Sequence, residues 1–413
     1  MDQQQLTLDL NDVLNAYSVN GSELANYDLY QRLSDAGTVS QAALEHKEPI
    51  GVAQESHSRA KRTVRWHQQT LKSMGLLERV PGKRGVWKRT LPNKSGLHEA
   101  AQGVTLVAYS TELGCAIWGD NKAFFSALNE PIHLCVTSPP YPLRKHRAYG
   151  GVDEKQWVEF IVSSLEPIAK NLAPGGSIVL NVSNDIFEPG RPSRSLYVER
   201  MVLALHDDLG LSLMDRWPWV NYSKPPAPTH WACIKRQQLR TAWEPIFWFT
   251  NNPDLVRSDN RRVLEAHSES HKRFLEKGNT RTASYGNGAY RLRGASSYRN
   301  QTAGSIPRNV IERGHVCADT RKARSIAAEL GLPAHPAMFP TAIPEFAIQF
   351  LTEPGELVVD PFAGSNKTGL AAERLNRRWL ATDLILEYNR VQAELFRGTP
   401  GYCVSEGLLK VAG

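Results

Sequence analysis

The sequence predicts an α/β fold in which helices cover both faces of a sheet, preceded in the chain by a smaller domain. Apolar runs at 132–136 and 177–182 are typical of strands buried on both faces. Amphipathic segments at 157–172 and 196–209 alternate with such runs, as helices packed on a sheet do. The length of 413 residues and the 41% content of hydrophobic residues suffice for a large core and two or three domains.

Composition and net charge limit the classes of protein to which the chain can belong. The formal net charge of +7 favours a polyanionic partner. The five cysteines are scattered and include no CxxC pair, so we expect neither a disulfide framework nor a metal site. No apolar run is long enough to span a bilayer, and the first residues lack a signal-peptide pattern. We therefore expect a cytoplasmic protein without a bound metal or a membrane partner.

The N-terminal region has the element order of a winged helix. We expect residues 1–20 to form a polar tail or a marginal helix, and residues 21–103 to form the domain and its linker. Apolar residues recur at helical spacing over 22–33 and 54–71. A glycine at position 75 then stops a helix, and two short strands flank a Pro-Gly turn.

This domain is strongly cationic. Residues 59–89 contain ten Lys and Arg residues but only one acidic residue, Glu78. A solvated charged face is one interpretation, but so one-sided a run favours contact with phosphates. The candidates for DNA contact are Arg62, Arg65, Lys83 and Arg84. Residues 64–71, 75–77 and 84–90 resemble the N-terminal winged-helix domain of Mrr-type restriction proteins, an accessory DNA-binding module.

A rigid segment follows the strand expected at 132–136. It consists of Ser138, Pro139, Pro140 and Tyr141, and its two prolines hold the backbone extended. The Ser138 Oγ atom and the Pro139 carbonyl can each accept a hydrogen of an exocyclic amine, and Tyr141 can stack on a flat base. The alternative is a plain turn followed by a packed tyrosine.

Further strands are expected on both sides of this segment. Two are expected before it, at 104–107 and 115–118, and the second leads into Gly119 and Asp120. A turn at 174–176 is expected to enter the strand at 177–182. Two more are expected near 211–222 and 243–250.

Residues 255–335 interrupt the alternation of strands and helices. No acidic residue lies between Glu276 and Glu312. Cations interleaved with tyrosines and amides are what phosphate contact and base reading require, although a disordered loop or a solvated surface are alternatives. The candidates for DNA contact are Arg281, Arg291, Arg293, Arg299 and Arg308.

A second glycine-containing turn lies near the C-terminus. A strand at 356–359 leads into Asp360, Pro361, Phe362, Ala363, Gly364 and Ser365, and a helix follows. A further strand ends at Asp383, about twenty residues later, which is the spacing of an acid that binds ribose hydroxyls. Taken alone, this turn is also compatible with an ordinary strand-to-helix connection.

Together, the SPPY segment at 138–141 and the DPFAGS loop at 360–365 resemble those of the amino-group DNA methyltransferases. The resemblance covers residues 104–413 and is to the permuted arrangement, in which SPPY precedes DPFAGS. It includes Gly119-Asp120, residues 174–176 and residues 335–340. The resemblance implies a seven-stranded, doubly wound, Rossmann-like sheet that binds S-adenosylmethionine, with a target-recognition insert at about 255–335.

The resemblance also implies roles for single residues. Asp120 binds the adenine amine, Asp383 binds the ribose, and the 360–365 loop cradles the ribose and methionine with Phe362. Phe339 lies in a segment that packs on the methionine side. Asn366 occupies the place of the loop's last glycine, and asparagine tolerates the positive φ that we expect there.

These features predict methyl transfer to an exocyclic amine of double-stranded DNA, with Ser138, Pro139, Pro140 and Tyr141 as the catalytic segment. The family's adenine-N6 enzymes usually have Asp or Asn in place of Ser138, which favours N4 of cytosine. No cysteine follows a proline, so the nucleophile of C5-cytosine methylation is missing. Adenine N6 methylation, a DNA-binding regulator with a decayed catalytic domain, and glutamine methylation in a protein remain alternatives. A restriction-modification role, with a cognate restriction endonuclease as partner, and a phage or orphan role are both open.

Overall fold

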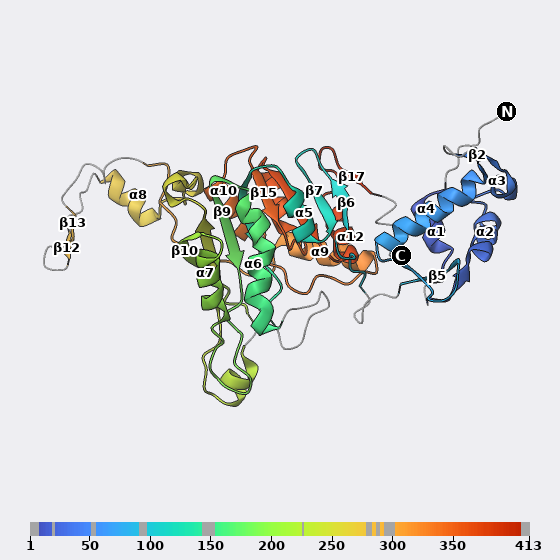
Figure 1. The fold of residues 1–413 in the computed structure, drawn as a ribbon. Helices are drawn as coiled ribbons and strands as arrows, with labels where there is room; N and C mark the ends of the chain where they lie inside the picture. The colour runs from blue at the N-terminus through green and yellow to red at the C-terminus, as the bar shows by residue number, and fades with distance from the viewer. Residues whose placement is uncertain are drawn as a thin grey trace.

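The computed structural model describes residues 8–405 apart from 19–20, 51–54, 91–96, 143–152, 225–226, 278–282, 286–289 and 293–301. Figure 1 shows a small N-terminal body beside a larger α/β body, from whose far side α8 projects. None of the helices in these described ranges combines the length and the apolar character needed to cross a bilayer.

The N-terminal body consists of four helices and a small antiparallel sheet. The helices are α1 (Leu10–Asn15), α2 (Asn26–Asp35), α3 (Gln41–Glu45) and α4 (Arg59–Ser73). The sheet has the order β1 (Leu24–Ala25), β5 (Val86–Arg89), β4 (Leu77–Arg79). A separate hairpin pairs β2 (Glu48–Ile50) with β3 (Glu55–His57). The three-stranded sheet packs against α4, whose apolar side is buried.

The helices expected in this region differ in outcome. For residues 1–20, where a polar tail or a marginal helix was expected, the described part forms the short helix α1, which carries a capping box between Asp9 and Asp12 and buries Val13 and Leu14 completely. The helix expected from residue 54 begins at Arg59. Ser58 caps α4 by accepting a hydrogen bond from the Lys61 backbone N–H, and residues 55–57 pair as a strand instead.

The larger body contains a ten-stranded sheet of order β14-β10-β11-β9-β8-β15-β16-β7-β6-β17. The five strands from β9 to β7 in this order are parallel, and β11, β10, β6 and β17 join through antiparallel pairs. Their bounds are β6 (Thr105–Ser110), β7 (Gly114–Gly119), β8 (Ile132–Thr137), β9 (Leu172–Asn181), β10 (Ser212–Val220), β11 (Trp243–Thr250), β14 (Ile311–Glu312), β15 (Leu357–Asp360), β16 (Arg378–Asp383) and β17 (Cys403–Val404).

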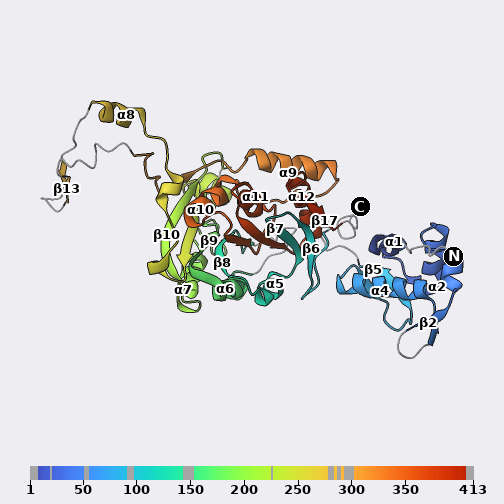
Figure 2. The ribbon, with the colours of Figure 1, turned by 90° about the horizontal axis from the view of Figure 1, so that it is seen from above.

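Helices cover both faces of this sheet, as Figure 2 shows. One layer contains α5 (Asn121–Ala127), α6 (Glu154–Lys170) and α7 (Tyr197–Asp207). The other contains α9 (Ala318–Glu329), α10 (Ala342–Leu351), α11 (Lys367–Arg374) and α12 (Leu386–Leu395). Along β8, Leu134 and Val136 pack on the α10–α12 layer and Cys135 packs on the α6 layer. Burial on both faces explains the continuous apolar run in the sequence.

Smaller elements lie outside these layers. They are α8 (Glu269–Glu276), the paired strands β12 (Ala283–Tyr285) and β13 (Tyr290–Leu292), a π-helical turn η1 (Thr229–Ile234), and the 3-10 turns η2 (Pro253–Leu255) and η3 (Asn260–Val263).

The sheet departs from expectation in three respects. It has ten strands where the resemblance implied seven, and the short edge strands β14 and β17 were not expected. Residues 174–176 do not turn into a strand but lie inside β9, where Gly175 adopts a φ of 73°. Part of the expected 255–335 insert, helix α9, packs against α12 and belongs to a helical layer.

Candidate functional site

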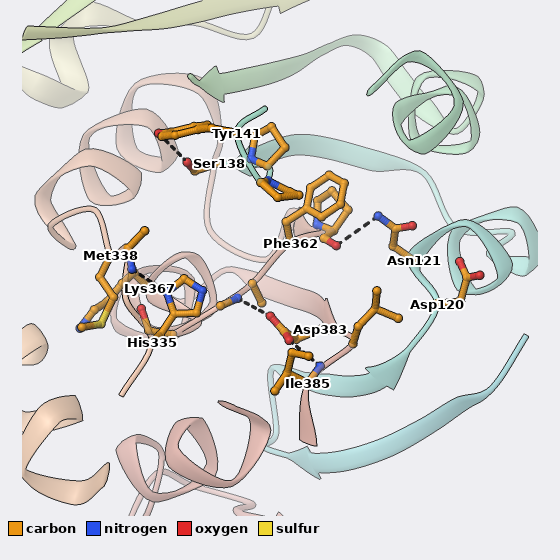
Figure 3. Close-up of a pocket in the computed structure, with 18 of the residues that line it drawn as sticks. Asp120, Asn121, Ser138, Tyr141, His335, Met338, Phe362, Lys367, Asp383 and Ile385 are labelled. Carbon is orange, nitrogen blue, oxygen red and sulfur yellow. Dashed lines mark hydrogen bonds between the residues drawn. The ribbon is translucent and has the colours of Figure 1, made fainter. Parts of the chain in front are cut away.

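The carboxyl ends of β7, β8, β15 and β16 surround a cavity of about 400 Å³ (Figure 3). β8 and β15 are neighbours, so residues more than 200 positions apart in the sequence meet at this edge of the sheet. The lining includes these expected site residues: Asp120, Ser138, Pro139, Pro140, Tyr141, Phe339, Pro361, Phe362, Ala363, Gly364, Ser365 and Asp383.

Partly buried hydrogen bonds fix the SPPY segment. The Pro140 carbonyl accepts a hydrogen bond of 2.7 Å from Trp157 Nε1. Ser138 Oγ lies 3.2 Å from the Tyr141 hydroxyl and donates to Asn181 Oδ1 at 3.4 Å. The Tyr141 hydroxyl also approaches Asn181 Oδ1, at 3.1 Å. Since Asn181 Oδ1 receives the Ser138 hydrogen, the serine oxygen keeps lone pairs for an amine in the cavity.

A charged network supports Tyr141 from behind. Its hydroxyl lies 3.3 Å from Glu244 Oε2, and Lys224 Nζ donates to Glu244 Oε1 at 2.9 Å and to Asp185 Oδ2 at 3.2 Å. Burial lowers the pKa of Lys224, but the two carboxylates outweigh burial and the net shift is upward. Asn181 and Glu244 were not among the residues predicted from the sequence. Asn181 is the last residue of β9 and Glu244 is the second residue of β11, and only the pairing of these two strands brings both to Tyr141.

The DPFAGS loop uses left-handed backbone conformations. Gly364 has a φ of 55°, and Asn366 has a φ of 48°. The expectation that Asn366 adopts a positive φ is therefore confirmed. Its Oδ1 accepts from the Gly369 backbone N–H at 3.0 Å, and its Nδ2 donates to the Tyr109 hydroxyl at 2.7 Å. A Cβ atom on Gly364 would lie 3.0 Å from His335 Nε2, so glycine keeps this part of the cavity open.

Asp360 was expected to bind the cofactor, but it is only 1% exposed and is not part of the cavity lining. Its Oδ1 accepts from Thr137 Oγ1 at 2.6 Å and from the Phe362 N–H at 3.0 Å. Its Oδ2 accepts from Thr368 Oγ1 at 2.8 Å. Burial raises its pKa to about 6. Asp360 thus ties the residue before Ser138 to the loop and positions both.

Asp383 reaches the cavity from the end of β16. Its two carboxylate oxygens accept hydrogen bonds from the N–H groups of Gly364, at 2.7 Å, and Ile385, at 2.8 Å. Burial raises its pKa to about 7. Each oxygen has a second lone pair, so the carboxylate can still accept from a ligand.

Opposite the SPPY segment, Asp120 and Asn121 form one end of the cavity (Figure 3). Asp120 caps α5 through Oδ1, which accepts from the N–H groups of Lys122 and Ala123 at 2.8 and 3.3 Å. Asn121 Nδ2 donates to the Pro361 carbonyl at 3.3 Å and joins this end to the loop. Asn121 was not predicted from the sequence, although its place after a strand-end acid was a usable signal.

Two lysines also line the cavity and were not predicted. Lys122 Nζ donates to Ser163 Oγ at 2.6 Å and lies 5.7 Å from the centre of the Phe160 ring. Lys367 is the first residue of α11 and is 1% exposed. Burial lowers its pKa to about 8. Phe339 lines the same cavity, as do Met338 and His335.

The candidate DNA-contacting residues are only partly described. Arg62, Arg65, Lys83 and Arg84 are exposed on the N-terminal body. Arg308 is exposed too, whereas Arg281, Arg293 and Arg299 lie outside the described residues. Arg291 lies in β13, and its side chain is outside the described part as well. Next to Arg62 on α4, the Trp66 side chain is 64% exposed.

Fold and site together define a Rossmann-like α/β protein with a small-molecule cavity at the carboxyl ends of its parallel strands. A family model described as DNA methylase matches residues 132–394. The chain belongs to this DNA methylase family.

Individual relatives agree with this assignment. The type II methyltransferase M.PvuII of Proteus hauseri is 32% identical over 297 residues, which cover 70% of this chain and 85% of that protein. The type II methyltransferase M.BglII of Bacillus subtilis is 24% identical over 278 residues, 65% of this chain and 64% of that protein. The solved structure of the PvuII DNA methyltransferase (cytosine-N4-specific) superposes with a TM-score of 0.55 at 28% identity, and covers 73% of this chain and 92% of that one.

Proposed function

We propose that the protein transfers a methyl group from S-adenosylmethionine to N4 of cytosine in double-stranded DNA. The observation that carries this proposal is the Ser138 hydroxyl at the cavity wall, whose hydrogen is directed to Asn181 Oδ1. The two hydrogens of an exocyclic amine need hydrogen-bond acceptors, and Ser138 Oγ offers one beside the Pro139 carbonyl. The name of the similar PvuII structure, cytosine-N4-specific, supports cytosine as the base.

The cavity residues fit S-adenosylmethionine. The volume of about 400 Å³ lies in the range of small-molecule sites. Asp383 would accept the ribose hydroxyls, Asp120 the adenine amine, and Phe362 with Phe339 would pack on the ligand. Gly364 leaves space that a Cβ would fill next to His335. When bound, the cofactor supplies a sulfonium methyl group.

The SPPY segment would then make the amine a better nucleophile. The lone pair of an exocyclic amine is delocalised into the ring. Ser138 Oγ and the Pro139 carbonyl accept its two hydrogens, which favours a pyramidal nitrogen with its lone pair free for in-line attack. These hydrogen bonds strengthen as the nitrogen becomes positively charged, so they stabilise the transition state more than the ground state. Asn181 and Glu244 hold the accepting geometry in advance.

We further propose that residues 21–103 are a winged-helix DNA-binding module and that the catalytic part is circularly permuted. Exposed cations on α4 and on the β4–β5 turn support phosphate contact by the module. The 255–335 region, with Arg308, would choose the site. The type II names of the relatives support a restriction-modification role in the cytoplasm, with a cognate endonuclease as partner.

Methyl transfer from labelled cofactor to DNA, RNA and protein, assayed in parallel, tests the proposal. We expect label in double-stranded DNA alone, recovered as N4-methylcytosine after digestion to nucleosides. Recovery as N6-methyladenine would correct the base, and label in protein or in no substrate would overturn the function.

A further inference from the structure

Lys367 is a buried ammonium group without a protein partner among the described residues. Its side chain is 1% exposed, and its Nζ atom has no hydrogen bond within the part of the chain that the structure describes. Burial of an ammonium group without an anion is unfavourable, and the lowered pKa of about 8 reflects this. The position therefore calls for an anionic ligand.

The charged groups around Lys367 are engaged elsewhere. Asp319 accepts from both Arg374 nitrogens, at 2.6 and 2.8 Å, and from Thr341 Oγ1 at 2.7 Å. Burial raises the pKa of the Cys317 thiol, but hydrogen bonds with Thr320 and Thr341 outweigh burial and lower it to about 7. Cys317 and Asp319 attract the lysine electrostatically and Arg374 repels it, but none of the three hydrogen-bonds to Lys367 Nζ. A direct anionic partner for Lys367 therefore has to come from the cavity that it lines.

The location of Lys367 within the cavity indicates which anion. In Figure 3, Lys367 lies with His335 and Met338 on one side, Asp120 and Asn121 lie on the other, and Asp383 lies between. Ser138 is nearer to the Lys367 side. The methyl group must be presented to Ser138, so the amino-acid end of the cofactor belongs on the Lys367 side and the adenine end beside Asp120.

We propose that Lys367 binds the α-carboxylate of the methionine part of S-adenosylmethionine. This inference rests on the cofactor named in the proposed function. The ion pair gives the buried ammonium its missing anion and fixes the methionine end, and with it the direction of the methyl group. Lys122, the other lysine of the cavity, is not equivalent, because Ser163 already accepts from it.

Calorimetric titration of the full-length protein with two ligands tests this role. The ligands are S-adenosylmethionine and its decarboxylated analogue, which differ only in the carboxylate. The proteins are the wild type, Lys367→Met, Lys367→Arg and Lys122→Met. We expect the wild type to bind the carboxylate-bearing ligand at least about tenfold more tightly.

In Lys367→Met this preference should vanish, because affinity for S-adenosylmethionine falls while affinity for the analogue stays within about twofold. Unchanged binding of the analogue also shows that the variant is folded. Lys367→Arg and Lys122→Met should keep the preference. Equal affinity for both ligands in the wild type, or a preference that persists in Lys367→Met, would overturn the role of Lys367 alone. If the wild type binds neither ligand, the cofactor assignment itself is wrong and this inference falls with it.

Discussion

Polar groups around the cavity are buried and hydrogen-bonded, whereas those of the cationic face of the N-terminal body (Arg62, Arg65, Lys83 and Arg84) are exposed to solvent. Behind the residues that line the cavity, Asp360 is buried and accepts three hydrogen bonds, and Asn181 is 4% exposed and fixes two hydroxyl groups. On the N-terminal body, Arg62 and Arg84 are exposed to solvent. Methyl transfer needs acceptors at fixed positions, whereas phosphate binding depends on the number of cations. Substitutions around the cavity should therefore change the methyl-transfer rate or the cofactor affinity, and substitutions on the cationic face should change the DNA affinity.

The largest expected effect is that of Ser138→Ala. Removal of the hydroxyl leaves the cavity shape intact but removes one amine acceptor. The single-turnover rate of methyl transfer should fall by about 100-fold to 1,000-fold, as for other preorganised polar groups. Calorimetry should show unchanged affinity for S-adenosylmethionine. An equal loss of cofactor affinity would mean that Ser138 supports the cavity and does not act on the base.

Asp383→Ala should weaken cofactor binding by about 100-fold, since it removes a ribose acceptor and frees the N–H groups of Gly364 and Ile385. DNA affinity should stay within about twofold, because phosphate contacts lie elsewhere. Calorimetry and DNA titration of the same preparation measure both constants, with Asp207→Ala on the exposed side of α7 as the matched control. Unaltered cofactor affinity would exclude the ribose role.

Asn181→Leu tests the support behind the SPPY segment. Without Oδ1, the Ser138 and Tyr141 hydroxyls lose a common acceptor, and we expect the single-turnover rate to fall about tenfold. Asn181→Asp keeps an acceptor oxygen and should restore most of the rate. If leucine and aspartate behave alike, the orientation of the hydroxyls by Asn181 does not matter for methyl transfer.

The pH dependence of cofactor binding sharpens the assignment of Asp383. Burial raises its pKa to about 7, so the carboxyl is largely protonated at pH 6 and ionised at pH 8. The ionised form is the better acceptor for ribose hydroxyls, so affinity should rise several-fold between these values. Asp383→Asn should flatten this rise. An equally steep rise in that variant would assign the titration to another group.

The sequence predicted most of the motif residues that line the cavity, but it did not predict the residues that support them or the short edge strands of the sheet. Both strand-end motifs lie at one cavity, because the carboxyl ends of parallel strands share an edge of the sheet. Asn181, Glu244 and Lys367 were missed, because their roles depend on tertiary contacts that no local pattern encodes. Asp360 was assigned to the ligand, whereas its burial makes it a link between β8 and β15. Short edge strands such as β14 and β17 were also missed, since two residues carry almost no periodic signal.

The smallest expected effect belongs to the cationic face. Arg62→Gln combined with Arg84→Gln should weaken DNA binding several-fold and lower the slope of log affinity against log salt by about two. The methylated sequence, mapped in an unmethylated host, should stay the same. A changed recognition sequence would mean that the N-terminal body reads bases.

One comparison separates the residues that act in methyl transfer from the residues that bind DNA. It measures the single-turnover methyl-transfer rate at saturating DNA, together with the DNA dissociation constant, for the wild type, Ser138→Ala and the double arginine variant. We expect Ser138→Ala to lower only the rate, and the arginine variant to raise only the dissociation constant. A slower rate in the arginine variant at saturating DNA, or a wild-type rate in Ser138→Ala, would contradict this expectation.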